Sequence, residues 1–321
     1  MSIKPEFQYL YDWEFEDKYD RVEAKIPIHS QFSPDCIKFL FDKNSSSITI
    51  YISGYVPIVC GTLFMSVKDV EREIVQSFLV FTFLKEENLQ WPFLIVDFYP
   101  ETESIDPKSA HILSHMLASS PNQEEKALKF VHSSIGSGYL PAILTAIQLF
   151  LNVEDRRAQV IDLLDVAANR YQDPSSIFQL GIVYYSLDSS REISIPYLAR
   201  AMSLGYTEAG VYLAKIFSPN SGVSFYQKDE VRAMDLLRHV LNEKPNAQAY
   251  YEYAKILLND DNYSSNHEEG RECLKKAQEL DSSLPDITPK KSHITKILIA
   301  LTATAAVAIA VYFKKSKKKQ I

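Results

Sequence analysis

The chain has 321 residues, of which 46% are hydrophobic and 23% are charged, and its formal net charge is −7. Residues 290–321 hold eight lysines and no acidic residue, so the rest of the chain carries 26 basic and 41 acidic residues, a net charge of −15. This acidic surface argues against nucleic-acid binding, and three scattered cysteines argue against a disulfide framework or a cysteine-ligated zinc site.

The first hundred residues carry the pattern of short β-strands and, at their start, no apolar run that would predict a signal or transit peptide. Runs rich in Val, Ile, Phe and Tyr alternate with turn signals such as 42–46. Residues 47–52 alternate polar and apolar side chains, as in a strand with one buried face. The predicted strands are 22–28, 36–41, 47–53, 58–64, 74–76, 78–84 and 93–98. Short strands joined by tight turns favour an antiparallel β-sandwich.

These residues also match a family pattern in order and spacing. The matching segments are Tyr11-Asp12-Trp13, 22–28 (VEAKIPI), 37–39 (IKF), 48–50 (ITI), Gly61-Thr62-Leu63 with Val67, and 81–85 (FTFLK) followed by Trp91. Residues 9–96 thereby resemble the CS domain, the β-sandwich of NudC-like proteins and small co-chaperones. The resemblance implies a domain that engages a chaperone or its clients.

Two tryptophans and two histidines admit more than one interpretation. Trp13 and Trp91 are either binding aromatics or core residues at the two ends of one domain, and we favour the core.

His111 and His115 have the i,i+4 spacing of zinc ligands on a helix. Ile112 stands where a general base would be and no third ligand follows nearby, so we predict two linker histidines and no metal site.

After residue 107 the pattern changes to that of paired helices. Small or apolar residues seven apart recur every 33 to 39 residues, at Ala127/Ser134, Val160/Ala167, Ser194/Ala201, Ala233/Val240 and Gly270/Ala277. A repeated unit of this length predicts an α-α helical solenoid. The spacing resembles Sel-like repeats, relatives of the tetratricopeptide repeat, over residues 123–282. The longer interval before Ala233 predicts an expanded loop at 218–228.

Finer features support the same repeat. Gly138 and Gly205 occupy connectors with identical offsets, 134–142 and 201–209. Gly181, Ala214 and Ala254 are small residues at points where two helices are predicted to approach closely.

The predicted solenoid has a concave face lined by the first helix of each repeat. Tyr184, Tyr212, Tyr250 and Tyr251 are the candidate protein-binding residues on that face, and packing between neighbouring repeats is the alternative. The tetratricopeptide relatives often bind chaperone C-termini through Lys and Asn on successive first helices. The candidate first helix at 141–151 has neither residue, so the predicted chaperone link comes from the N-terminal domain only.

No catalytic constellation is present in the sequence pattern. The segment 136–138 (GSG) follows no predicted strand and precedes no Gly-Lys-Ser/Thr, so it is a helix connector and not a phosphate loop. No Ser-His-Asp or Cys-His arrangement follows from residue order alone. We predict no enzymatic activity, no cofactor and no catalytic residue.

The C-terminal region reads as a membrane anchor. Residues 297–313 are apolar or small, and a helix of that length rises about 25 Å, enough for a thin hydrocarbon core. A buried core helix and an amphipathic surface helix are the alternatives, and both normally carry a polar face. Five lysines follow and are the candidate membrane-address residues: Lys314, Lys315, Lys317, Lys318 and Lys319. The short span and basic tail favour a mitochondrial-type outer membrane, with peroxisome and endoplasmic reticulum left open.

These patterns together predict a multidomain chain. Its parts are a CS-like β-sandwich (1–100), a linker (101–122), Sel- or tetratricopeptide-like repeats (123–282), a linker (283–293), a transmembrane helix (294–313) and a basic tail (314–321). The predicted function is a non-enzymatic, tail-anchored adaptor or co-chaperone on the cytosolic face of an organelle. Its partners are the membrane and proteins, a chaperone or its clients among them, with no nucleic acid and no small-molecule substrate. The rival hypothesis is an outer-membrane receptor or organelle-morphology adaptor acting through its repeats.

Overall fold

The computed structural model describes residues 12–28, 30, 32–218, 228–259 and 266–288. The predicted membrane helix (294–313), the five address lysines and most of the loop predicted at 218–228 lie outside these residues. The chain divides into two compact units, Met1–Ser176 and Ile177–Ile321.

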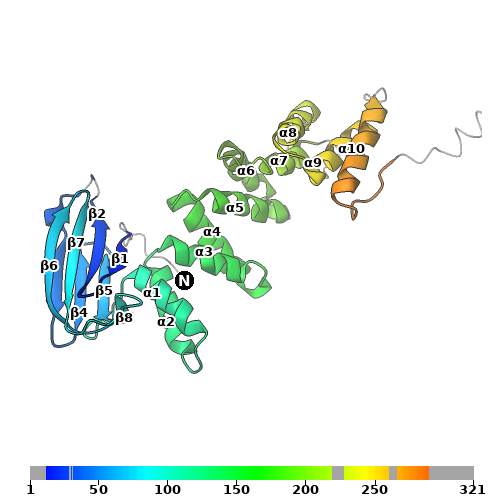
Figure 1. Cartoon of the computed structure of the whole chain (residues 1–321). Coiled ribbons are helices and arrows are strands. Elements are labelled where there is room, and N and C mark those ends of the chain that lie inside the picture. Colours follow the sequence, from blue (N-terminus) through cyan, green and yellow to red (C-terminus); the bar gives the residue numbers. More distant parts are fainter. Residues whose placement is uncertain (1–11, 29, 31, 219–227, 260–265, 289–321) are drawn as a thin grey trace, which may run out of the picture. The chain divides into compact units, whose positions relative to one another are not determined.

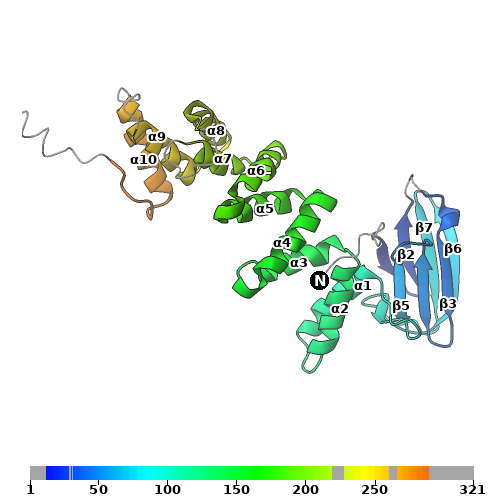
Figure 2. The ribbon, with the colours of Figure 1, turned by 180° about the vertical axis from the view of Figure 1, so that it is seen from behind.

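The first unit opens with two four-stranded antiparallel sheets (Figures 1 and 2). Their strands are β1 (Glu14–Asp17), β2 (Arg21–Pro27), β3 (Lys38–Asp42), β4 (Ser47–Tyr51), β5 (Val59–Leu63), β6 (Val67–Val75), β7 (Phe78–Lys85) and β8 (Ile95–Asp97). The strand orders are β1-β2-β7-β6 and β3-β4-β5-β8. The predicted antiparallel architecture is therefore confirmed.

The sandwich core follows from period-two alternation. On β2 the side chains of Val22, Ala24 and Ile26 are fully buried, and in the antiparallel register they face Phe83, Phe81 and Leu79 of β7. Burial of each valine, isoleucine, leucine or phenylalanine side chain in this set contributes about 1.5–3 kcal/mol. Trp13 and Trp91, which are 3% and 2% exposed, belong to the same core, so the prediction that both are core residues is confirmed.

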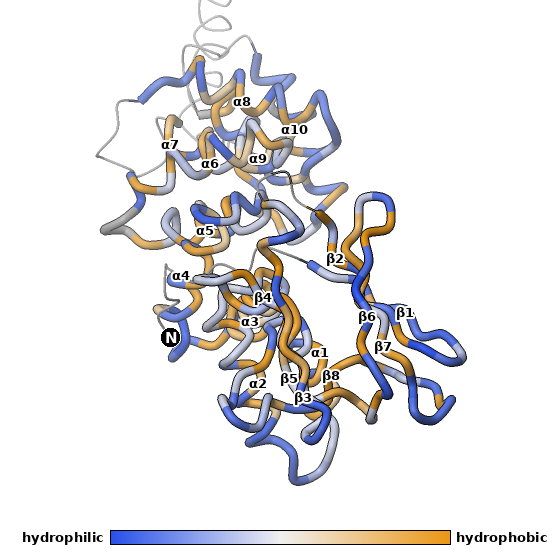
Figure 3. The backbone as a smooth tube through the Cα atoms, turned by 90° about the vertical axis from the view of Figure 1, so that its left-hand side faces the viewer, coloured by the Kyte–Doolittle hydropathy of each residue, from blue (hydrophilic) through white to orange (hydrophobic). Residues whose placement is uncertain are grey.

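The sequence did not predict one strand and predicted only part of another. β1 was not predicted, and only the end of β6 was. β6 is an edge strand with the sequence VKDVEREIV, and most of its residues are exposed, so it carries charge on both faces and shows no apolar alternation. Figure 3 shows this strand as largely hydrophilic, whereas β4 and β5 of the other sheet are largely apolar. Charged edge strands of this kind resist pairing with other chains.

The segment 101–122, predicted as a linker, contains helix α1 (Pro107–Ala118). Ala110 and Leu113 of α1 lie in the sandwich core, together with Ile105 and with Phe130 of the following helix. Asp106 caps α1, because its Oδ1 accepts the N–H of Ser109 at 2.9 Å. The region after the last strand is therefore packed against the sandwich.

Helices fill the rest of the described chain. In the first unit they are α2 (Glu124–Gly136), α3 (Leu140–Phe150) and α4 (Arg157–Asp165), and α4 continues into a π-helical turn (Val166–Arg170). Helix α5 (Pro174–Ser186) crosses the boundary between the units. The second unit continues with α6 (Ser194–Ser203), α7 (Ala209–Phe217), α8 (Glu230–Glu243), α9 (Ala247–Asn259) and α10 (His267–Leu280).

The predicted helical repeat is borne out at the positions that defined it. All ten small or apolar residues spaced seven apart are buried, and they fall on the second helix of each pair: α2, α4 with its π-helical turn, α6, α8 and α10. Gly181 of α5 lies where a Cβ would come within 2.9 Å of Leu198 on α6, so the predicted close approach is also present.

The two predicted connectors have the same backbone. Gly138 and Gly205 adopt positive φ of 75° and 94°. The next N–H in each case returns to a carbonyl five residues earlier, from Tyr139 to Ser134 at 3.2 Å and from Tyr206 to Ala201 at 3.0 Å. This is the glycine-dependent helix end of the Schellman type. It directs each second helix into the first helix of the next repeat.

Candidate protein-binding surface

The first helices of the second unit carry a continuous row of aromatic and charged side chains. The row is Tyr185 on α5, Tyr212 and Lys215 on α7, and Glu252 and Lys255 on α9, and we call it the Tyr–Lys row. Residues three apart lie on the same face of a helix, which places the Tyr212–Lys215 and Glu252–Lys255 pairs side by side.

Contacts between helices join the row from end to end. The rings of Tyr185 and Tyr212 meet edge to face with centroids 5.4 Å apart. The Lys215 ammonium lies 5.7 Å from the centre of the Tyr212 ring and 3.7 Å from Glu252 Oε1. The Lys255 Nζ lies 2.9 Å from Glu252 Oε2. The row therefore crosses three consecutive repeats.

The row is positively charged overall. Glu252 is 8% exposed and is shared by Lys215 and Lys255, whose side chains are 25% and 30% exposed. The Arg191 guanidinium lies 5.4 Å from the centre of the Tyr185 ring and adds a third cation. Burial raises the pKa of Tyr185 and of Tyr212 above the ordinary value, so both hydroxyls stay protonated at neutral pH and are able to donate hydrogen bonds.

The four tyrosines predicted from sequence fall in different surroundings. Tyr212 is part of the row, and Tyr251 lies at its end, 5.9 Å from the Lys255 ammonium. Tyr184 packs on Tyr197 of α6 with ring centroids 5.6 Å apart, so its ring takes part in helix packing. Tyr250 lies next to Lys276 of α10. Protein binding by these four residues stays a prediction.

Sequence reasoning missed Tyr185, Lys215, Glu252 and Lys255. Tyr185 follows Tyr184 directly, and one helical residue turns a side chain by about 100°, so choosing between neighbours needs a known helix orientation. The i,i+3 spacing of Tyr212 with Lys215 and of Glu252 with Lys255 was the available signal.

The described residues also bear on a membrane span and on a metal site. No single helix there is both long enough and apolar enough to cross a bilayer, and only α2 and α3 taken together, with a bend of 118° between them, satisfy length and composition. No group of three or more His, Cys, Asp or Glu side chains converges within the described part of the chain.

Comparison with known proteins gives a likeness of fold for parts of the chain. No protein-family model matches it, and no curated protein does. A nuclear movement protein from E. cuniculi GB-M1 is 17% identical over 26% of this chain and 98% of its own, with a TM-score of 0.23. A Sel1 repeat protein from Oxalobacter formigenes is 16% identical over 55% and 74%, with a TM-score of 0.39. An immunity protein from Pseudomonas aeruginosa is 16% identical over 56% and 70%, with a TM-score of 0.31.

Proposed function

We propose that this chain is a non-enzymatic adaptor that binds partner proteins through the Tyr–Lys row and is held at the cytosolic face of an organelle by its C-terminal segment. The observation that carries the binding role is the row itself, in which half-buried tyrosines and partly exposed lysines from three repeats form one surface. Tyrosines are over-represented among the residues that dominate protein interfaces, because a large rigid ring carries a hydroxyl at its tip.

The charge of the row indicates the partner. Residues 177–288 carry 11 Lys and Arg and 16 Asp and Glu, a net charge of −5. In contrast, the row has two lysines that share one carboxylate, and Arg191 adds a cation beside Tyr185. A local basic surface in an acidic surrounding attracts and orients acidic segments. We therefore propose an acidic peptide segment with aromatic or aliphatic side chains as the bound element.

Replacing both Tyr185 and Tyr212 by alanine is expected to weaken peptide binding at least tenfold, because about 1.4 kcal/mol or more of interface energy is lost with the two rings. The measurement is fluorescence anisotropy with fifteen-residue peptides sorted by net charge. Tyr19→Ala, at a tyrosine of the first unit that is 79% exposed and lies outside the row, is the control and is expected to change affinity less than twofold. Equal binding of acidic and basic peptides would contradict the proposal.

The membrane part of the proposal is supported by the sequence alone: an apolar stretch at 297–313 between lysines on both sides. A tagged full-length chain is expected to resist carbonate extraction, and a chain ending at residue 290 is expected to be released.

Changing Lys314, Lys315, Lys317, Lys318 and Lys319 to serine is expected to divert the protein to the endoplasmic reticulum, because the basic tail no longer opposes insertion there. An unchanged location would show that the lysines are not the address.

An organelle receptor or morphology adaptor is the second candidate, and one observation favours it: every residue of the row belongs to the repeats and none to the sandwich. In this case the CS-like sandwich is a supporting surface and not the chaperone-binding module. The Tyr185→Ala/Tyr212→Ala variant separates a receptor that acts through the repeats from a co-chaperone that acts through the sandwich. A receptor loses recruitment of its cargo to the organelle, whereas a co-chaperone acting through the sandwich retains protection of unfolded clients.

A further inference from the structure

Glu252 is the acidic residue of the Tyr–Lys row, and its carboxylate contacts both lysines. Its Oε1 lies 3.7 Å from the Lys215 Nζ, and its Oε2 accepts a hydrogen bond from the Lys255 Nζ at 2.9 Å. Glu252 is buried, whereas the side chains of both lysines are partly exposed. The carboxylate is therefore covered, while the two cations that it holds still reach solvent.

Neighbouring side chains fix the carboxylate in this place. The Lys215 Nζ of α7 also donates to Gln248 Oε1 at 3.4 Å, so this lysine is held by two residues of α9, one turn apart. Burial raises the pKa of Tyr185, and the negative charge of Glu252 adds to that rise, so the carboxylate also acts on a tyrosine of α5. Glu252 thus interacts with side chains from all three first helices of the row.

Two ammonium groups that converge on one point are an arrangement suited to a compact dianion. A phosphate group carries about −1.5 to −2 charges at neutral pH and three acceptor oxygens, so it gains from two cations at once. In this row the point between the lysines is already filled by a carboxylate. A phosphate placed there would bring its charge against that of Glu252, in a buried position where little water screens the repulsion.

We propose that Glu252 is a specificity-determining residue that excludes phosphate groups from the Tyr–Lys row. This inference rests on the proposed peptide-binding function and narrows its partner to an acidic segment whose charge comes from Asp and Glu and not from phosphorylated side chains. A carboxylate of such a segment pairs with one lysine from its solvent side, whereas a phosphate gains its advantage only between the two. Specificity of this kind needs a repulsive group as well as attractive ones.

Fluorescence anisotropy with the full-length chain in mild detergent at pH 7.5 tests the exclusion. Two fifteen-residue acidic peptides differ at one central position, which is glutamate in one and phosphoserine in the other. The wild-type chain is expected to bind the glutamate peptide at least as tightly as the phosphoserine peptide. Glu252→Gln keeps the shape of the side chain and removes its charge, so the ratio of phosphoserine to glutamate affinity is expected to rise at least tenfold.

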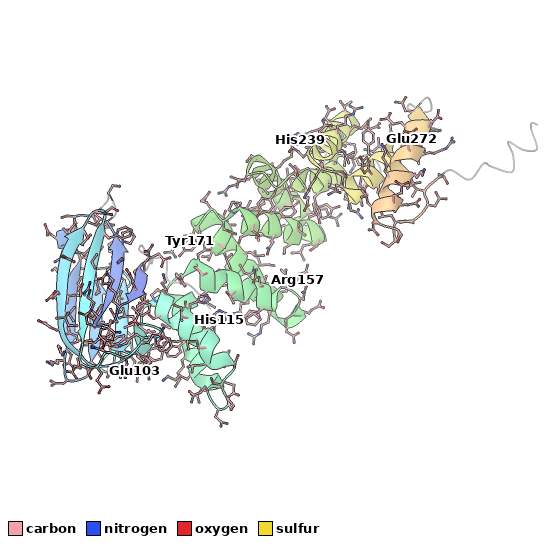
Figure 4. All side chains as sticks on the ribbon, viewed as in Figure 1. Glu103, His115, Arg157, Tyr171, His239 and Glu272 are labelled. Atoms are coloured by element: carbon pink, nitrogen blue, oxygen red, sulfur yellow. The ribbon has the colours of Figure 1, made fainter. Side chains whose placement is uncertain are left out.

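Two further variants separate the local charge from other causes. Glu272→Gln removes the same charge at an exposed residue of α10, labelled in Figure 4, and is expected to leave the affinity ratio unchanged. Glu252→Asp keeps the charge in the row and is expected to retain the wild-type ratio. A raised ratio in both glutamine variants would point to net charge alone and would overturn the proposal.

The remaining outcomes also decide the matter. A wild-type chain that prefers the phosphoserine peptide would overturn the exclusion, and so would an equal ratio in Glu252→Gln and wild type. A wild-type chain that binds neither peptide would contradict the proposed function instead. In that event Glu252→Gln still tests the exclusion: new binding of the phosphoserine peptide alone supports it, and continued absence of binding overturns it.

Discussion

Replacement of Lys85 by methionine is expected to lower the free energy of unfolding of the first unit by about 3–5 kcal/mol. The Lys85 side chain is 1% exposed although it carries a charge. Its Nζ donates to the carbonyls of Lys18 and Leu89, both at 2.7 Å, and lies 2.7 Å from Asp17 Oδ1. Methionine fills the space but leaves one carboxylate and two carbonyls without their cation.

The measurement is urea unfolding followed by tryptophan fluorescence. The chain has two tryptophans, Trp13 and Trp91, and both lie in the sandwich core, so the signal reports this unit alone. Lys25→Met is the matched control. Its ammonium pairs with Glu16 and Glu23, yet the side chain is 29% exposed, and we expect a loss below about 1 kcal/mol. Equal destabilisation by the two substitutions would show that the buried ion pair has no special weight.

The strand that carries Lys85 could be predicted from the sequence, but the partners of Lys85 could not. Lys85 was matched as the last residue of the CS-like strand pattern, and β7 runs close to where it was predicted. Its partners could not be predicted, because Asp17 and Lys18 lie nearly seventy residues earlier. Asp17 is the last residue of β1, a strand that was not predicted, and Lys18 follows it directly. Local alternation identifies which face of a strand is buried, but it does not identify what that face meets.

The helical repeat was more predictable than the surface it carries. Small residues at helix crossings recur with the repeat, since each unit packs on its neighbour in the same way. The residues of the Tyr–Lys row do not recur with the repeat: Tyr185, Tyr212 and Glu252 are different residue types on three first helices. The repeat was therefore readable from spacing, whereas the row needed the orientation of each helix.

The segment 101–122 was predicted to be a linker, but part of it packs into the core of the sandwich. Ile105, Ala110, Leu113 and Phe130 share the core of the sandwich. Deletion of the strands would uncover these side chains, about 1.5–3 kcal/mol of burial for each large one. Point variants in the row or in the sandwich are therefore better tests of function than removal of the whole N-terminal domain.

Asp106 holds this junction together. Its carboxylate is fully buried and accepts three hydrogen bonds, from the Ser109 N–H at 2.9 Å, the Cys60 N–H at 3.2 Å and the Trp13 indole at 3.4 Å. These donors belong to α1, to β5 and to the residue before β1. Asp106→Ala leaves all three buried and unpaired, and we expect the first unit to lose about 3–5 kcal/mol, since each orphaned group costs about 1–3 kcal/mol and part is relieved by water entry.

The titration of Asp106 supplies a sharper test than its removal. Burial, partly offset by the three hydrogen bonds, raises the pKa of this carboxyl to about 6 from its ordinary value of 3.8. A raised pKa means that the folded state holds the proton more tightly than the unfolded state does. The stabilisation from this group is therefore complete below about pH 4 and is lost as the pH rises through about 6.

Asp106→Asn cannot titrate at this position and serves as the reference. Between pH 4.5 and pH 7, the free energy of unfolding of the wild-type chain is expected to fall by about 2 kcal/mol more than that of Asp106→Asn. Asparagine keeps an acceptor for Ser109 and Trp13 but turns an amide toward the Cys60 N–H. The variant is therefore expected to be less stable than wild type at pH 4.5. Most of this difference in the free energy of unfolding is expected to disappear by pH 7. Urea unfolding at the two pH values, read by tryptophan fluorescence, measures the difference directly. A gap that stays constant would mean that Asp106 is ionised throughout, with its hydrogen bonds outweighing its burial. In that case the junction between the sandwich and α1 would be held by a charge-assisted cap instead of a titrating one.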